Sequence, residues 1–129
     1  MPTLTLVRGL PGSGKSTTAR KLVEANPDTA HFEADMCFVG RDGVYRFDPD
    51  RLHLAHRWCL RQTRKALKAG QDVVVSNVFA RRANMEPYIN LAIDCDAELQ
   101  YMTCRGEFGS IHNVPPVAVE AMRRMWEGI

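Results

Sequence analysis

The sequence lacks several features that would place it in a specialised class of protein. None of its apolar runs approaches the roughly 20 residues that a membrane-spanning helix requires. Its N-terminus also lacks the charged start and long apolar stretch of a signal peptide. None of its four cysteines forms a C-x-x-C pair, which argues against both a zinc site and a disulfide framework. We therefore expect a cytoplasmic protein with reduced thiols and no membrane association.

Little net charge is available to attract polyanions. Seventeen Lys and Arg nearly balance fifteen Asp and Glu, which leaves +2, so any site for a polyanion must come from local placement of charge. The composition, 45% hydrophobic and 25% charged, is typical of soluble globular proteins. Its 129 residues fit one domain of the usual size. We expect a single domain over residues 1–129, and the oligomeric state is left open.

Short β-rich runs alternate with helical stretches along the chain. The expected strands cover residues 3–7, 29–33, 72–76 and 98–103, and the expected helices cover 15–25, 49–69, 84–93 and a stretch from 116. This alternation predicts an α/β fold with a short, mainly parallel sheet of about four strands flanked by helices. In the second helix, apolar or small side chains at helical spacing should face the sheet: Leu52, Ala55, Cys59, Thr63 and Ala66.

The turn after the first strand carries the most specific motif. Residues 9–16 read GLPGSGKS and match G-x-x-x-x-G-K-[ST], with an apolar strand before and a helix after. The glycines allow a tight turn whose N–H groups form a nest for phosphate, and the helix N-terminus adds its positive dipole. Lys15 can reach the β- and γ-phosphates, and the Ser16 hydroxyl can bind Mg²⁺. The motif therefore predicts a P-loop NTPase fold that binds ATP with Mg²⁺.

Ligands of parallel α/β sheets bind at the carboxyl ends of the strands, which makes residues just past each strand candidates. Asp35 follows the second strand, where a carboxylate can act as general base for an incoming hydroxyl or hold Mg²⁺ through its water. The alternative is an N-cap for a short turn that begins at Met36. Glu33 is a second carboxylate, which strand alternation could either bury or expose.

Basic residues offer two further candidate sites. Arg81 and Arg82 follow the third strand and could bind an acceptor phosphate, or form a solvated pair at a helix start. Residues 51–71 contain no acid, and one face of their helix carries Arg57, Arg61, Arg64, Lys65 and Lys68. Such a face could follow a nucleic-acid backbone, or could simply be solvated.

A family resemblance rests on these motifs. Residues 8–20, RGLPGSGKSTTAR, resemble the opening of P-loop kinases of the polynucleotide 5′-kinase type and of small AAA-labelled ATP-binding proteins of phages, bacteria and animals. The similarity continues through Asp35 and residues 45–49 to residues 112–115, which is nearly the whole chain.

The resemblance implies a compact kinase-like fold, ATP with Mg²⁺, and phosphoryl transfer to a hydroxyl. It implies Asp35 as general base and a lid at about residues 104–114. We expect Lys15 and the lid residue Arg105 to complete the catalytic set, with Ser16 and Asp35 as the Mg²⁺-binding residues. The implied phosphate or Mg²⁺ contacts are Lys15, Ser16 and Thr17, and we expect Gly12, Ser13 and Gly14 of the same loop to bind the nucleotide as well.

Three departures from the kinase pattern shape the function we expect. Ser76 and Asn77 stand where the third strand of such kinases commonly ends in an acid, the lid contains a single arginine, and residues 36–38 are apolar where a basic residue is expected. We expect a phosphotransferase, and the acceptor we favour is a 5′-OH polynucleotide end. The alternatives are a kinase of a small metabolite or modified base, and an ATP-binding or ATP-hydrolysing switch acting through a protein partner.

Overall fold

The computed structural model describes residues 1–106 and 116–128. Its strands are β1 (Thr3–Gly9), β2 (Ala30–Phe32), β3 (Val73–Asn77) and β4 (Glu98–Cys104). Its α-helices are α1 (Lys15–Ala25), α2 (Leu52–Lys68), α3 (Arg82–Asp94) and α4 (Pro116–Met125), and its 3-10 helices are η1 (Ala34–Phe38) and η2 (Pro49–Arg51). Every expected strand and helix is confirmed, with ends that differ by a few residues.

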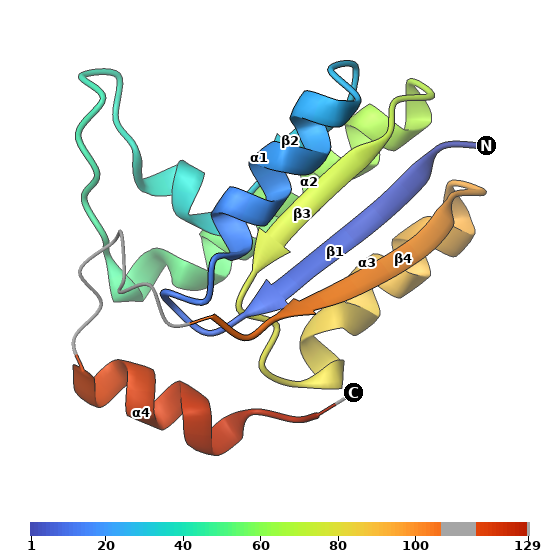
Figure 1. The fold of residues 1–129 in the computed structure, drawn as a ribbon. Coiled ribbons are helices and arrows are strands. Elements are labelled where there is room, and N and C mark those ends of the chain that lie inside the picture. The colour runs from blue at the N-terminus through green and yellow to red at the C-terminus, as the bar shows by residue number, and fades with distance from the viewer. Residues whose placement is uncertain (107–115, 129) are drawn as a thin grey trace.

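The four strands form one parallel sheet in the order β2-β3-β1-β4. Helix α1 covers one face of the sheet, α2 and α3 cover the other, and α4 lies beyond the carboxyl ends of the strands (Figure 1). This is the expected three-layer α/β architecture. It brings the ends of β1, β2 and β3, and the turns that follow them, to the same edge of the sheet.

Side-chain alternation along the central strands supplies a core on both faces. Leu4 and Leu6 of β1 pack into the cluster under α2 and α3, whereas Val7 packs with Ala19 of α1 and Val74 on the opposite face. All five residues of β3 are buried, as a strand covered on both faces requires.

The start of the second helix differs from the sequence prediction. The segment begins with η2, whose N-cap Asp48 accepts a hydrogen bond from the Asp50 N–H at 3.0 Å, and α2 itself begins at Leu52. Four of the five residues expected to face the sheet are buried, but Leu52 is 38% exposed. The prediction for Leu52 was wrong because the N-terminal part of α2 packs on η1, where Ala55 clusters with Ala34 and Phe38, and Leu52 lines a cavity instead.

Two of the sequence-based predictions concern segments that lie partly or wholly outside the described residues. Of the expected lid at 104–114, Cys104 ends β4 and residues 107–114 lie outside the described residues, as do residues 112–115 of the family resemblance. Within residues 1–106 and 116–128, no helix combines the length and apolar character needed to cross a membrane.

Candidate active site

The loop between β1 and α1 adopts a conformation that its glycines make accessible. Gly12 and Gly14 have positive φ angles of 80° and 89°, and α1 begins directly after Gly14 without a side-chain cap. The first N–H groups of α1 are therefore available to an anion. Gly9 leaves space for its neighbours: a Cβ there would collide with the Ser13 side chain and lie 3.1 Å from the Cys104 carbonyl oxygen.

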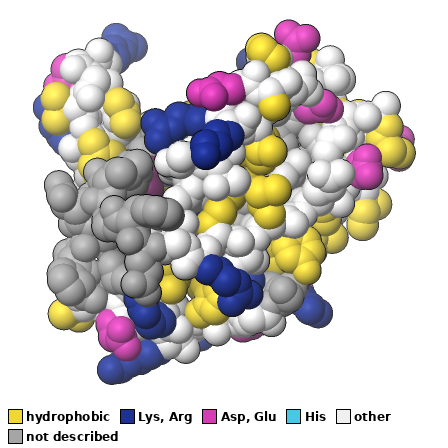
Figure 2. Space-filling view, viewed as in Figure 1, with side chains coloured by type: hydrophobic (Ala, Val, Ile, Leu, Met, Phe, Trp, Pro, Cys, Tyr) yellow, Lys and Arg dark blue, Asp and Glu magenta, His cyan; other side chains and the backbone are white. Residues whose placement is uncertain are grey.

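A cavity of about 1160 Å³ opens above this loop at the carboxyl ends of the strands. It is lined by the expected phosphate-binding residues Gly12, Ser13, Gly14, Lys15, Ser16 and Thr17, and by Asp35. Figure 2 shows the molecule hollowed between the loop of residues 39–48 and α1, with Lys and Arg side chains on the α1 side. Arg20 and Lys21 of α1 are among the lining residues. The structure thus brings the expected base and the phosphate-binding loop into one cavity.

Lys15 is partly buried in this cavity, close to the carboxylates of Glu33 and Asp35. Burial lowers the pKa of its ammonium group below the ordinary value, and the negative charges of Glu33 and Asp35 oppose that shift. A cation flanked by two carboxylates and a cluster of backbone N–H groups is suited to phosphate oxygens.

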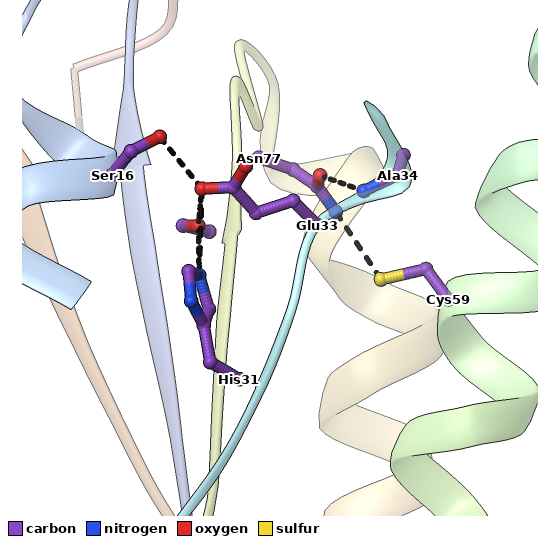
Figure 3. Close-up of polar contacts among 7 residues, drawn as sticks. Ser16, His31, Glu33, Ala34, Cys59 and Asn77 are labelled. Atoms are coloured by element: carbon purple, nitrogen blue, oxygen red, sulfur yellow. Dashed lines mark hydrogen bonds and ion pairs between the residues drawn. The ribbon is translucent and has the colours of Figure 1, made fainter. Parts of the chain in front are cut away.

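Glu33 occupies a central position that the sequence left open. Its Oε1 accepts hydrogen bonds of 2.6 Å from both the Ser16 and the Ser76 hydroxyl groups, and His31 Nε2 lies 2.7 Å from Ser76 Oγ (Figure 3). His31 Nε2 is also 3.4 Å from Glu33 Oε1. Burial alone would raise the pKa of Glu33, but the hydrogen bonds from His31, Ser16 and Ser76 outweigh burial and lower the pKa to about 2.

This arrangement places a carboxylate beside the end of β3, which carries no acid of its own. Because β2 and β3 are neighbours, the carboxylate of Glu33 lies over Ser76 and reaches the P-loop serine. Sequence reasoning looked for an acid along β3 itself. The only available signal was a second carboxylate two residues before Asp35.

Asp35 is held by a tyrosine from the following loop. The Tyr45 hydroxyl donates to Asp35 Oδ1 at 3.0 Å, and burial followed by the Asp35 charge raises the pKa of Tyr45. The N-cap of η1 is Glu33, so Asp35 is not the cap that the alternative interpretation required. Asn77 fixes the start of η1, because its Oδ1 accepts the Ala34 N–H at 2.9 Å (Figure 3).

The remaining expected site residues lie outside the cavity lining. Arg81, Arg82 and Arg105 are exposed, and the described lining residues do not include them. The Arg82 N–H donates to Glu127 Oε2 at 3.3 Å, which places Arg82 beside the C-terminal segment. Apolar and aromatic side chains also line the cavity, namely Tyr45, Phe47, Leu52, Phe79, Pro87 and Tyr88.

Arg8 is a buried arginine that the sequence analysis did not single out, and it stabilises the turn after β3 at the edge of the cavity. Arg8 is fully buried, and its guanidinium donates to the carbonyl oxygens of Phe79, Ala80 and Glu127 at 2.7–3.2 Å while lying 3.9 Å from the Trp126 ring centroid. Phe79 has a positive φ of 46°, which costs free energy in a bulky residue. The Arg8 contacts hold this strained turn and join it to the chain after α4.

The oxygen atoms of Ser16 and Glu33 could bind Mg²⁺ together with the phosphates of a nucleotide, but they are too few to bind it alone. The described residues contain no group of three or more His, Cys, Asp or Glu that could hold a metal by themselves. The Ser16 hydroxyl and the Glu33 carboxylate are 2.6 Å apart, and both residues line the cavity. These are hard oxygen donors of the kind Mg²⁺ takes alongside nucleotide phosphates and water.

The fold and this loop define a P-loop NTPase-type α/β domain. Residues 4–106 match the family described as AAA domain, and the chain belongs to that family. The expected family and fold class are thereby confirmed.

The chain is similar to several proteins of known sequence or structure. It is 38% identical over 90 residues to human NEDD4-binding protein 2, a match that covers 69% of this chain and 5% of that protein. The Pnkp1/Rnl/Hen1 RNA repair complex contains a similar fold, with a TM-score of 0.74 at 17% identity over 96% of this chain and 43% of that one. The APS kinase CysC of Mycobacterium tuberculosis, in complex with AMPPNP and APS, gives a TM-score of 0.61 at 16% identity over 93% and 67% of the two chains. At these identities the two structures establish a shared α/β P-loop NTPase fold.

Proposed function

We propose that this domain transfers the γ-phosphoryl group of ATP to an acceptor hydroxyl. The observation that carries the proposal is that Lys15, Ser16 and Asp35 line one cavity, with the Asp35 carboxylate fixed by Tyr45. A P-loop alone would suit any nucleotide-binding protein. A carboxylate across the cavity from that loop adds the group that a transfer to a hydroxyl needs.

Each residue has a distinct task in this reaction. The backbone N–H groups of the loop and Lys15 bind the β- and γ-phosphates, and Ser16, backed by Glu33, would hold Mg²⁺. Bound Mg²⁺ would neutralise charge on the phosphate oxygens. Asp35 accepts the proton of the acceptor hydroxyl while the oxygen of that hydroxyl bonds to the γ-phosphorus. The bond between the γ-phosphorus and the β,γ-bridging oxygen breaks, and ADP leaves. Arg105 would cover the phosphates from the segment after β4.

The acceptor we favour is the 5′-OH end of a polynucleotide. Support comes from the likeness to a chain of an RNA repair complex and from the basic face of α2. The apolar wall at Phe47 and Leu52 favours a second candidate, a small metabolite or modified base with a free hydroxyl. The other alternative is an ATP-binding or ATP-hydrolysing switch that acts through a protein partner, and the carboxylate of Glu33 beside Ser76 is equally compatible with it.

The test is transfer from γ-labelled ATP, with Mg²⁺, to a panel of 5′-OH DNA and RNA oligonucleotides, nucleosides and small alcohols. We expect label on a 5′-OH end, abolished by Lys15→Ala. Label on a nucleoside or small alcohol alone would favour the second candidate. Release as free phosphate with every acceptor would contradict the phosphotransferase proposal.

A further inference from the structure

A second, smaller cleft adjoins the candidate active site on α2. It has a volume of about 210 Å³ and is lined by Arg57, Leu60, Arg61 and Arg64, which we call the α2 groove. Arg57 and Leu60 also line the large cavity that contains Asp35. The groove and the active-site cavity therefore lie side by side and share Arg57 and Leu60 at their boundary in the N-terminal half of α2.

The charge of this surface is one-sided. Arg57, Arg61 and Arg64 are exposed, and no acid interrupts residues 51–71. One carboxylate approaches from α3: Asp94 Oδ2 lies 3.9 Å from Arg64 Nη2, with both side chains about half exposed. An exposed pair at that distance is weak, so the groove keeps most of its positive charge.

The spacing of these arginines suits a run of phosphates. At 1.5 Å per residue, Arg64 lies about 10 Å along the helix axis from Arg57, and exposed Lys68 on the same face lies about 16 Å away. A strand stacked as in B-DNA carries one charge per about 3.4 Å of rise, so this face spans about five nucleotides of a strand in that conformation. Because Arg57 lines both this groove and the cavity that contains Asp35, the basic face is adjacent to the candidate active site.

We propose that the α2 groove binds the sugar–phosphate backbone of a single-stranded polynucleotide whose 5′-OH end lies at Asp35. The strand leaves the cavity past Arg57 and follows Arg61 and Arg64 toward Lys68. This proposal rests on the proposed function and adds to it the path of the substrate. Recognition is of phosphate charge and is therefore independent of base sequence.

The experiment compares binding and transfer in the same protein preparations. Binding is measured by fluorescence anisotropy with 3′-labelled, 5′-OH oligothymidylates of 2, 4, 6 and 10 nucleotides between 50 and 500 mM salt. The test variant is Arg61→Gln/Arg64→Gln, and the control is Arg41→Gln/Arg124→Gln, which removes two exposed arginines from the loop after η1 and from α4. Transfer from γ-labelled ATP is measured with the 2-mer and the 10-mer.

We expect the wild-type Kd to fall with length up to about six nucleotides and then level off. Each single-strand phosphate contact contributes about 0.7 to the slope of log Kd against log salt, so losing two should lower that slope by about 1.4. If these two contacts contribute nothing at 1 M salt, the slope difference of about 1.4 gives the change at lower salt. The Kd of the test variant for the 10-mer should then exceed that of the wild type about 70-fold at 50 mM salt and about 14-fold at 150 mM. The 2-mer and the control variant should change less than about twofold.

The outcomes separate this proposal from the proposed function. Transfer to the 10-mer with unchanged Kd and KM in the test variant would overturn the groove and leave the function standing. Length-dependent binding that the test variant loses, without transfer by the wild type, would support the groove and contradict the function. An equal loss in the control would mean general electrostatic attraction and would overturn the groove.

Discussion

Replacing Glu33 by Gln perturbs the hydrogen-bond network at the centre of the site while nearly preserving side-chain shape. The Glu33 pKa falls from its ordinary 4.5 to about 2 in the folded chain. At about 1.4 kcal/mol per pKa unit, the ionised carboxylate contributes about 3 kcal/mol to the free energy of unfolding. Because the folded-state pKa is the lower one, this stabilisation is complete above pH 4.5 and is lost as the pH falls from 4.5 to about 2.

The assay is urea unfolding, followed by tryptophan fluorescence, at several pH values between 7 and 2.5. The difference between wild type and Glu33→Gln should be largest at pH 7 and shrink toward pH 2. Glu24→Gln, which removes an exposed carboxylate from α1, is the matched control and should give a constant small difference. A Glu33→Gln difference that stays constant with pH would refute the conclusion that this carboxylate is held ionised by its three donors.

Three further predictions concern residues that support the site. Arg8→Met should lower the free energy of unfolding by about 3 kcal/mol in urea titrations, because it leaves buried carbonyl oxygens without their charged donor; a loss below 1 kcal/mol would contradict the bracing role. Tyr45→Phe should lower kcat about fivefold in the transfer assay, since a hydrogen bond of about 1 kcal/mol no longer orients Asp35, and an unchanged kcat would show that Tyr45 is dispensable. Gly9→Ala should weaken ATP binding, measured by calorimetry, more than tenfold because its Cβ displaces the P-loop, whereas Gly128→Ala, with open space around it, should have no effect.

Elements with strong local signals were predictable from the sequence. The glycine-rich loop and the Asn-Pro-Asp stop fix both ends of α1, which the structure places at residues 15–25 as expected. The uninterrupted apolar run of β3 likewise identified a strand buried on both faces. In each case the information lies within a few consecutive residues.

The site's internal contacts were not predictable, because they join residues distant in sequence. Glu33 meets Ser76 across 43 residues only because β2 pairs with β3, a neighbour relation that chain order does not reveal. Alternation could not orient Glu33 either, since β2 is only three residues long. Arg8 is similar: a charged side chain inside a strand gives no local sign that it will meet carbonyls 71 and 119 residues away.

The central claim is that Asp35 takes the proton of an acceptor hydroxyl during transfer from ATP. The most direct measurement compares wild type with Asp35→Asn, quantifying ADP and phosphomonoester in one reaction and ATP affinity by calorimetry. The account predicts equal amounts of the two products in the wild type, and in the variant a rate lower by on the order of 10²–10⁴ with ATP affinity retained. Undiminished phosphomonoester formation by Asp35→Asn, or wild-type ADP accompanied only by free phosphate, would contradict it.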